Sequence, residues 1–173
     1  MAKTAVNSVT NANVYLEGAS LLGRVEEATL PDIVAKMSEH KGLGLVGDFE
    51  LPSGLDKMSA KLVFNSFYAD AIKAGGNIYR PVALQLRYSI ETFGAGGRQR
   101  QTPAVTHLRG TFKKLPLGAF KQQEKVKIEQ EMNVTYVKQV IGGEELIEVD
   151  VLENVYRVDG VDLLADYRRI VGG

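Results

Sequence analysis

The residues with the greatest catalytic potential are two histidines, His40 and His107, in a chain of 173 residues that has no cysteine. The absence of cysteine excludes thiolate catalysis, disulfides and cysteine-ligated metal sites. Neither histidine has a Ser/Asp setting that the sequence supports as an activated nucleophile. We therefore predict that both histidines are surface or sheet-face residues and that the protein is not an enzyme.

One glycine pattern has the spacing of a phosphate-binding loop. It is Gly42-x-Gly44-x-x-Gly47. Such a loop needs a strand before it and a helix after it, so that the phosphate lies at the helix N-terminus. The residues that follow, Asp48 to Pro52, do not begin a helix. We therefore expect no nucleotide site here, and no cofactor elsewhere in the chain.

Clustered charges suggest two other kinds of site. Glu144, Glu145, Glu148 and Asp150 could bind a cation, but their spacing lacks the regularity of a calcium loop, which favours a solvated edge. A basic group could contact nucleic acid, but binders of this kind add aromatic stacking platforms, and few aromatic residues are near. Direct nucleic-acid recognition is therefore not expected. The basic group consists of Arg98, Arg100, Arg109, Lys113 and Lys114, and the aromatic residues near it are Phe93, Phe112 and Phe120.

Charge is segregated along a chain whose net charge is zero. From Arg80 to Lys127, ten Lys and Arg stand against two Glu, a net charge of +8. From Ile128 to Asp166, ten Asp and Glu stand against one Lys and one Arg, a net charge of −8. The two segments either neutralise each other as neighbours in one sheet or form oppositely charged sides suited to head-to-tail association.

The element around which these groups must be arranged is the stretch from Glu124 to Ile141. Apolar residues alternate with polar ones along it, with Gln130 and Lys138 as exceptions, so it is predicted to be a half-buried β-strand. Typical strands have roughly 3–10 residues, whereas this one would have about 16. Its predicted inward face runs from Val126 to Tyr136 and contains Val126, Ile128, Met132, Val134 and Tyr136.

The remaining pattern indicates a mainly β, antiparallel protein. Pro81–Phe93 and Ala104–Lys114 are predicted as further long strands, with Gly94–Pro103 as a flexible basic loop between them. Gly142-Gly143 is predicted to form a two-residue hairpin turn. One helix, 67–73, is expected to be capped by Ser66 and to flank a sheet, and a second short helix, 163–169, by Asp162 near the C-terminus. We predict one domain, 1–173, folded as a two-sheet β-sandwich or partial barrel.

Two segments are expected outside the regular core. Residues 1–12 are small and polar and are expected to form a flexible arm. Residues 41–57 contain four glycines and a proline, which argue against a regular element. Their apolar side chains nevertheless predict that this loop docks on its own domain or on a neighbour. No apolar run approaches the ~20 residues of a membrane span, and the N-terminus lacks the apolar core of a signal peptide, so we expect no membrane partner and a cytoplasmic origin.

The chain resembles the major tail tube proteins of contractile phage tails and R-type bacteriocins. The resemblance covers nearly the whole chain and depends on the order and spacing of several weak motifs. The motifs are Asn13-Val-Tyr-Leu-Glu-Gly18, Thr29-Leu-Pro31, Gly54-Leu-Asp-Lys-Met58, Leu108-Arg-Gly110, the segment from Gly143 to Asp150, and Gly160-Val-Asp-x-Leu164 followed by Arg168.

The resemblance implies a structural subunit that assembles into stacked hexameric rings around a channel for DNA, in the tail of a virion assembled in the host cytoplasm. The inner sheets of six subunits would join into one β-barrel. Partners would be further copies of the chain and the sheath, tape-measure, baseplate and tail terminator proteins, with DNA only in transit. The polar strand faces would line the channel through Gln85, Arg87, Ser89, Glu91, His107, Arg109, Lys125, Lys127, Glu129 and Glu131. The glycine-rich loop would reach adjacent subunits through Gly42, Leu43, Gly44, Leu45, Val46, Gly47, Phe49, Leu51 and Leu55.

Two alternatives stay open at this point. A bacteriocin tube or the tube of a type VI secretion system would use a related fold and the same kind of ring. A monomeric β-barrel that binds a small ligand would belong to a different functional class.

Overall fold

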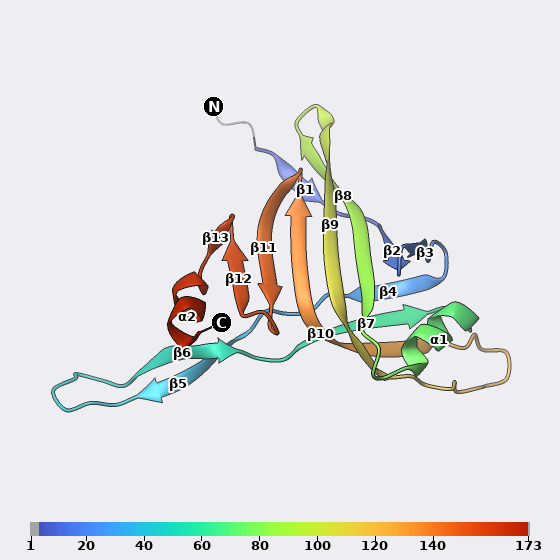
Figure 1. Ribbon diagram of the computed structural model, residues 1–173. Coiled ribbons are helices and arrows are strands. Elements are labelled where there is room, and N and C mark those ends of the chain that lie inside the picture. The colour runs from blue at the N-terminus through green and yellow to red at the C-terminus, as the bar shows by residue number, and fades with distance from the viewer. Residues whose placement is uncertain (1–3, 173) are drawn as a thin grey trace.

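Antiparallel strands form most of the structure, a computed structural model that describes residues 4–172 (Figure 1). Two short helices accompany them, as the sequence predicts. The strands are β1 (Val6–Ser8), β2 (Ala12–Leu16), β3 (Ala19–Ser20), β4 (Val25–Thr29), β5 (Ala35–His40), β6 (Phe49–Leu55), β7 (Met58–Phe64), β8 (Val82–Gly94), β9 (Gly97–Lys114), β10 (Ile128–Ile141), β11 (Glu144–Asp150), β12 (Val155–Val158) and β13 (Val161–Asp162), and the helices are α1 (Ala69–Gly76) and α2 (Ala165–Val171).

Strand β10 belongs to two layers, which explains its length. Its first half, Ile128–Val134, pairs with β7, and its second half, Tyr136–Ile141, pairs with β11, while β9 lies along its other edge. The main sheet therefore has the order β13-β12-β11-β10-β9-β8-β2-β3, and β7 and β4 branch from the lower half of β10. Figure 1 shows β4 and β7 crossing the lower ends of β8 and β9. The core lies between these two layers.

A β-bulge at Thr135 reverses the alternation of β10. Opposite β9, Val134 pairs with Gly110 and Tyr136 pairs with Arg109, so Thr135 has no partner on that strand. An unpaired extra residue shifts all later side chains to the opposite face. Ile128, Met132 and Val134 are buried as predicted, but the prediction that Tyr136 packs in the core is wrong, because Val137 takes that place.

The polar residue Gln130 is part of the core. It is fully buried beneath α1, and its Nε2 atom donates a long 3.4 Å hydrogen bond to the carbonyl of Ala71. Its Oε1 atom has no hydrogen-bond partner within residues 4–172. Helix α1 spans 69–76 rather than 67–73, and its N-cap is Tyr68 without a side-chain cap, so the predicted Ser66 cap is wrong. Ala71 and Gly75 are its buried residues.

Strand pairing extends into segments that the sequence predicts to be a flexible loop and a flexible arm. The predicted flexible loop Gly94–Pro103 is wrong, because β8 and β9 continue through it and only Ala95-Gly96 forms the turn. Gly142 and Gly143 do form a two-residue turn, both with positive φ (63° and 90°), as predicted. The segment expected to be a flexible arm contains β1, which pairs with β8. Residues 1–3 of that segment lie outside the described residues.

Strands β5 and β6 form a separate two-stranded hairpin that projects from the body (Figure 1). The prediction of no regular element in 41–57 is therefore wrong for Phe49–Leu55, which pairs with Ala35–His40. Near the C-terminus, α2 begins at Ala165, after Leu164 as N-cap rather than Asp162. Asp162 still contributes, because its Oδ1 accepts a hydrogen bond from the Leu164 amide.

Candidate functional site

The largest functional feature is the polar face of the main sheet. Because neighbouring strands are in register, polar side chains line up in rows that cross the sheet. The longest row crosses eight strands, from β3 to β13, and carries both signs of charge. It contains Ser20, Tyr15, Gln85, His107, Lys138, Glu148, Arg157 and Asp162.

Glu148 lies at the centre of an ion network on this face. Tyr136 donates a hydrogen bond to its Oε1 at 2.9 Å, and Arg157 donates to its Oε2 at 2.7 Å. Lys138 lies between Glu145 and Glu148. Burial favours the neutral form of the Glu148 carboxyl, but these partners outweigh it and lower its pKa. Burial and the bond to Glu148 raise the pKa of Tyr136 to about 12.

The network joins the C-terminal elements to the long strands. Arg109 donates to Asp150 at 2.8 Å, and its guanidinium lies 5.1 Å from the centre of the Tyr136 ring. At the far end, Arg168 of α2 donates to Asp162 at 2.7 Å. That hydrogen bond lowers the pKa of Asp162 against the opposing effect of burial. Hydrogen bonds and ion pairs therefore link the strands of this face from β9 to α2.

The structure brings eight of the ten predicted channel residues onto the polar faces of their strands. Gln85, Arg87, Ser89 and Glu91 alternate along β8, His107 and Arg109 along β9, and Glu129 and Glu131 along β10. Burial, with the nearby charges of Lys138 and Arg87, lowers the pKa of His107. Glu131 and Glu129 pair with Lys113 and Lys114 at 2.7 and 3.1 Å.

The other two predicted channel residues lie elsewhere. Lys125 and Lys127 precede β10, and Lys127 forms a 2.7 Å ion pair with Glu26 of β4. Sequence reasoning also missed Tyr136, Lys138 and Arg157 as members of this face. The sequence does contain one sign of Tyr136 and Lys138 on this face. Lys138 breaks the apolar alternation of the strand, because the side chains change face after the bulge.

The charge segregation of the sequence is partly neutralised within the sheet. Basic residues of β9 pair with acidic residues of β10 and β11, as in the pairs Arg109–Asp150, Lys113–Glu131 and Lys114–Glu129. The acidic residues considered for a cation site are neutralised in the same way, since Glu145, Glu148 and Asp150 each have a cationic partner. Within residues 4–172, no group of three histidine or carboxylate side chains is placed to hold a metal ion.

The β5–β6 hairpin is a second candidate surface. Its predicted contact residues lie at the tip and along β6, and almost all of them are exposed. Leu43 and Val46 are fully exposed at the tip, and His40 packs against Phe49 with ring centres 5.1 Å apart. Such apolar exposure is unusual for a monomer and marks a contact surface.

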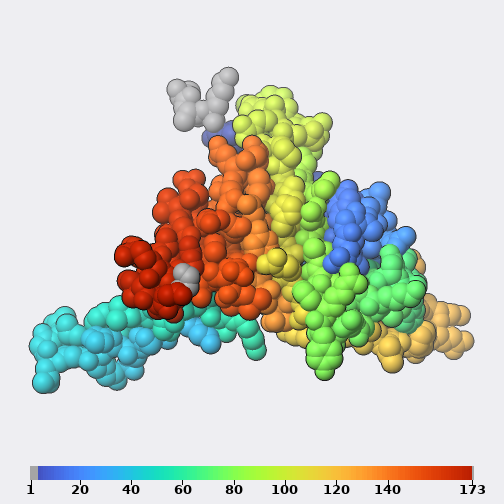
Figure 2. Space-filling model, viewed as in Figure 1, coloured from blue at the N-terminus to red at the C-terminus, as the bar shows by residue number. Residues whose placement is uncertain are grey.

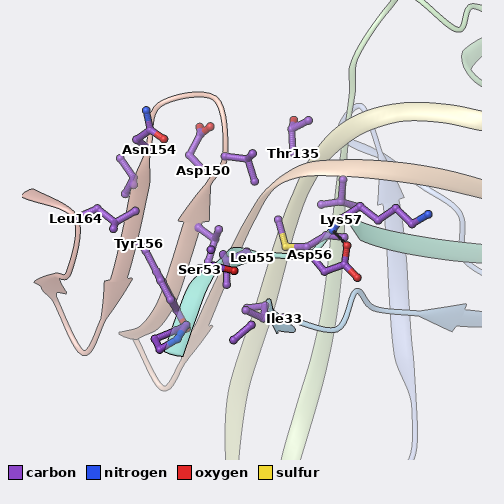
Figure 3. A pocket seen from close by; sticks show the side chains of 18 of the residues that line it. Ile33, Ser53, Leu55, Asp56, Lys57, Thr135, Asp150, Asn154, Tyr156 and Leu164 are labelled. Carbon is purple, nitrogen blue, oxygen red and sulfur yellow. Dashed lines mark hydrogen bonds between the residues drawn. The ribbon is translucent and has the colours of Figure 1, made fainter. Parts of the chain in front are cut away.

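A hollow of about 840 Å³ lies at the base of this hairpin (Figure 3). Ile33, Leu55, Tyr156 and Leu164 line it together with Asp56 and Asp150. No helix in the described part of the chain is both long and apolar enough to cross a membrane. The described structure thus offers a polar sheet face linked by ion pairs and a projecting apolar hairpin, and neither resembles a catalytic centre.

A model of the family described as phage tail tube protein FII matches residues 6–172. The chain belongs to this family. It is therefore a structural, non-enzymatic tail tube subunit of a contractile tail or a related injection system. The tail tube protein of Escherichia phage P2 is 29% identical over 166 residues, covering 92% of this chain and 94% of that protein. The major tail tube protein of Serratia phage KSP20 is 26% identical, with 88% of each chain covered.

Solved structures support the same fold. One is the sheath–tube complex of an extracellular contractile injection system, PVC, in its extended state, with a TM-score of 0.57, 12% identity and coverage of 75% of this chain and 87% of that one. Another is the sheath/tube terminator of the same kind of system, also with a TM-score of 0.57, at 10% identity and 75% and 92% coverage.

Proposed function

We propose that this tail tube subunit assembles into hexameric rings that stack into the inner tube of a contractile tail. The family match over residues 6–172 carries this proposal. In the ring, the inner sheets of six copies join into one barrel, which satisfies strand edges that would otherwise expose unpaired backbone groups. The hairpin formed by β5 and β6 supplies contacts between copies.

The polar face of β8–β10 lines the channel in this proposal. Its charges are of mixed sign, and many are already paired within the subunit, as in Arg109–Asp150 and Glu91–Arg98. Phosphate contacts with free cations dominate the affinity of proteins for DNA. A wall of paired charges would therefore let DNA pass without holding it.

The proposed partners follow from the assembly. Similar proteins have been solved within sheath–tube and terminator complexes, which supports a sheath and a terminator as partners here. Tape-measure and baseplate proteins would contact the inside and the end of the tube. The protein would act in the virion tail after assembly in the host cytoplasm.

A second candidate is the tube of an injection particle that carries protein rather than DNA. The likeness to the tube of an extracellular injection system favours keeping it, although that likeness concerns the fold alone. The two candidates share the ring and the channel, and they differ in the cargo of the particle in which the tube is found.

The channel assignment can be tested by labelling, because the chain has no natural cysteine. In Ser89→Cys protein, a small maleimide should react before and after assembly. A maleimide on a bulky polymer should react only with the free subunit, because it cannot enter the tube. Reaction of the bulky reagent along assembled tubes would refute the channel position of β8. Absence of any ring or rod of wild-type protein in negative-stain images would refute the tube itself.

A further inference from the structure

An exposed aromatic patch lies at the opposite end of the molecule from the hairpin. Phe67 precedes α1 and stacks on Phe120 of the β9–β10 connection, with ring centres 5.9 Å apart and planes 19° apart. Phe120 and the nearby Leu117 are 74% and 81% exposed. Figure 2 shows the connection, in gold, and the hairpin, in cyan, at opposite ends of the face in view. We call Phe67, Leu117 and Phe120 the aromatic patch.

The two ends carry opposite charge. Residues 39–50 of the hairpin contain three acidic residues and one lysine, a net charge of −2. Residues 115–127 of the connection contain three lysines and one glutamate, a net charge of +2. Lys41 is already held by Glu39 and Asp48, and Lys127 by Glu26. Among the described residues, Glu50 at one end and Lys125 at the other have no ion-pair partner.

We propose that the hairpin tip of one copy docks on the aromatic patch of the next copy. This inference rests on the proposed tube and specifies one of its contacts. Leu43 and Val46 would cover Phe120 and Leu117, and Glu50 would approach Lys125. Because the two surfaces differ and lie at opposite ends of one chain, the contact is head-to-tail, and such contacts propagate into closed rings or stacks.

The hollow at the base of the hairpin is the competing receptor. Both of its acidic lining residues are already paired, Asp150 with Arg109 and Asp56 with Lys36, and Lys57 is the one cationic residue among its described lining. Charge therefore does not separate the two receptors, and cross-linking must do so. The connection that carries Leu117 and Phe120 of the aromatic patch also contains Lys125, which has no ion-pair partner among the described residues.

Cross-linking within assembled tubes tests the proposal. The double variant Val46→Cys with Phe120→Cys is treated with a short bismaleimide and resolved on a denaturing gel. A ladder extending beyond the dimer is expected, because each copy would be linked at both ends. Each single variant should give no ladder. The matched control is Val46→Cys with Ile170→Cys, since Ile170 is 75% exposed on α2, the helix beside the hollow, and it should give no ladder.

If the Val46→Cys with Phe120→Cys variant assembles into rods but gives no cross-linked ladder, the proposal is overturned. A ladder from the Val46→Cys with Ile170→Cys variant would instead assign the hairpin to the hollow. If the Phe120 variant forms no rods, Leu117→Cys replaces it with the same expected outcomes. Failure of the wild-type protein to form rods would instead refute the proposed tube.

Charge exchange provides an independent test. Glu50→Lys alone or Lys125→Glu alone should raise the protein concentration needed for rods by about tenfold, and the two together should restore it. Glu153→Lys, a control on the β11–β12 turn, should leave it unchanged. No restoration in the double variant would contradict the contact.

Discussion

The sheet around β10 and the β5–β6 hairpin use the same kind of strand pairing with opposite results. Around β10, every second side chain is buried until the bulge, and the polar face is tied together by Arg109, Tyr136 and Glu148. In the hairpin, all residues of β5 are exposed and β6 is exposed up to Gly54. An isolated two-stranded hairpin is marginally stable in water.

This contrast separates folding from assembly within one chain. The main sheet buries its own apolar residues in the core of the subunit. The hairpin exposes apolar residues that only another surface can cover. Substitutions in the sheet should therefore change the stability of the subunit, whereas substitutions in the hairpin should change assembly alone.

The largest effect is expected at Gly110 of β9. A Cβ atom there would lie 2.0 Å from the carbonyl oxygen of Asn133, a backbone atom that cannot move aside. Gly110→Ala should cost about 3 kcal/mol or more of folding free energy, measured by thermal unfolding. In the hairpin, a Cβ at Gly47 meets nothing within 4 Å, so Gly47→Ala should leave the melting temperature unchanged. Equal effects at the two glycines would contradict the contrast.

Substitutions at the hairpin tip should abolish assembly without lowering the stability of the subunit. Leu43→Ser with Val46→Ser removes two fully exposed apolar side chains, so the free energy of unfolding should stay within about 0.5 kcal/mol of wild type. Negative-stain images should show no rods. The control Leu152→Ser removes an exposed leucine from the β11–β12 turn and should still form rods. Normal rods from the hairpin variant would refute the assembly role.

A substitution at Gln130 is expected to stabilise the subunit, by less than Gly110→Ala destabilises it. The buried Oε1 of Gln130 has no hydrogen-bond partner in the described part of the chain, and the hydrogen bond from its Nε2 is long, so Gln130→Met should raise the free energy of unfolding by about 1 kcal/mol. Gln139 is the matched control, because it donates a 2.8 Å hydrogen bond to Tyr88. Gln139→Met should lower stability by about 1 kcal/mol. Chemical denaturation measures both, and a destabilised Gln130→Met protein would contradict this account of the core.

The smallest effect is the pH dependence contributed by Glu148. Its pKa is lower in the folded protein, so its contribution is present above the unfolded value of about 4.3 and is lost as pH falls through the folded value. Glu148→Gln should therefore flatten the fall in unfolding free energy between about pH 5 and pH 3. Glu144→Gln, at an exposed carboxylate, serves as the control. An unchanged slope in the Glu148 variant would contradict the network.

Much of the fold follows from the alternation of side chains in the sequence. The pattern predicts the long antiparallel strands, the turn at Gly142-Gly143 and two helices near their observed positions. It fails at the bulge, because an extra residue at Thr135 moves every later side chain to the other face, and the exception at Lys138 is the one sign of that change in the alternation. Tyr136 was therefore assigned to the core, although it belongs to the polar face.

Composition misled the prediction in the two glycine-rich segments. Pairing with a neighbouring strand overrides local propensity in Gly94–Pro103 and Phe49–Leu55, where β8 and β5 supply the partners. The sequence predicts the contact surface of the hairpin from the apolar residues of its glycine-rich loop. The aromatic patch was not predictable, because Phe67 and Phe120 are 53 positions apart in the sequence and meet only through the placement of α1.

Hydrogen exchange of the free subunit and of the assembled tube tests the division between folding and assembly most directly. The amides of β8, β9 and β10 should exchange slowly in both states. The amides of residues 35–55 should exchange quickly in the free subunit and at least about tenfold more slowly in the tube, because docking protects a hairpin that is marginal alone. Equal protection of the hairpin before and after assembly would contradict the account.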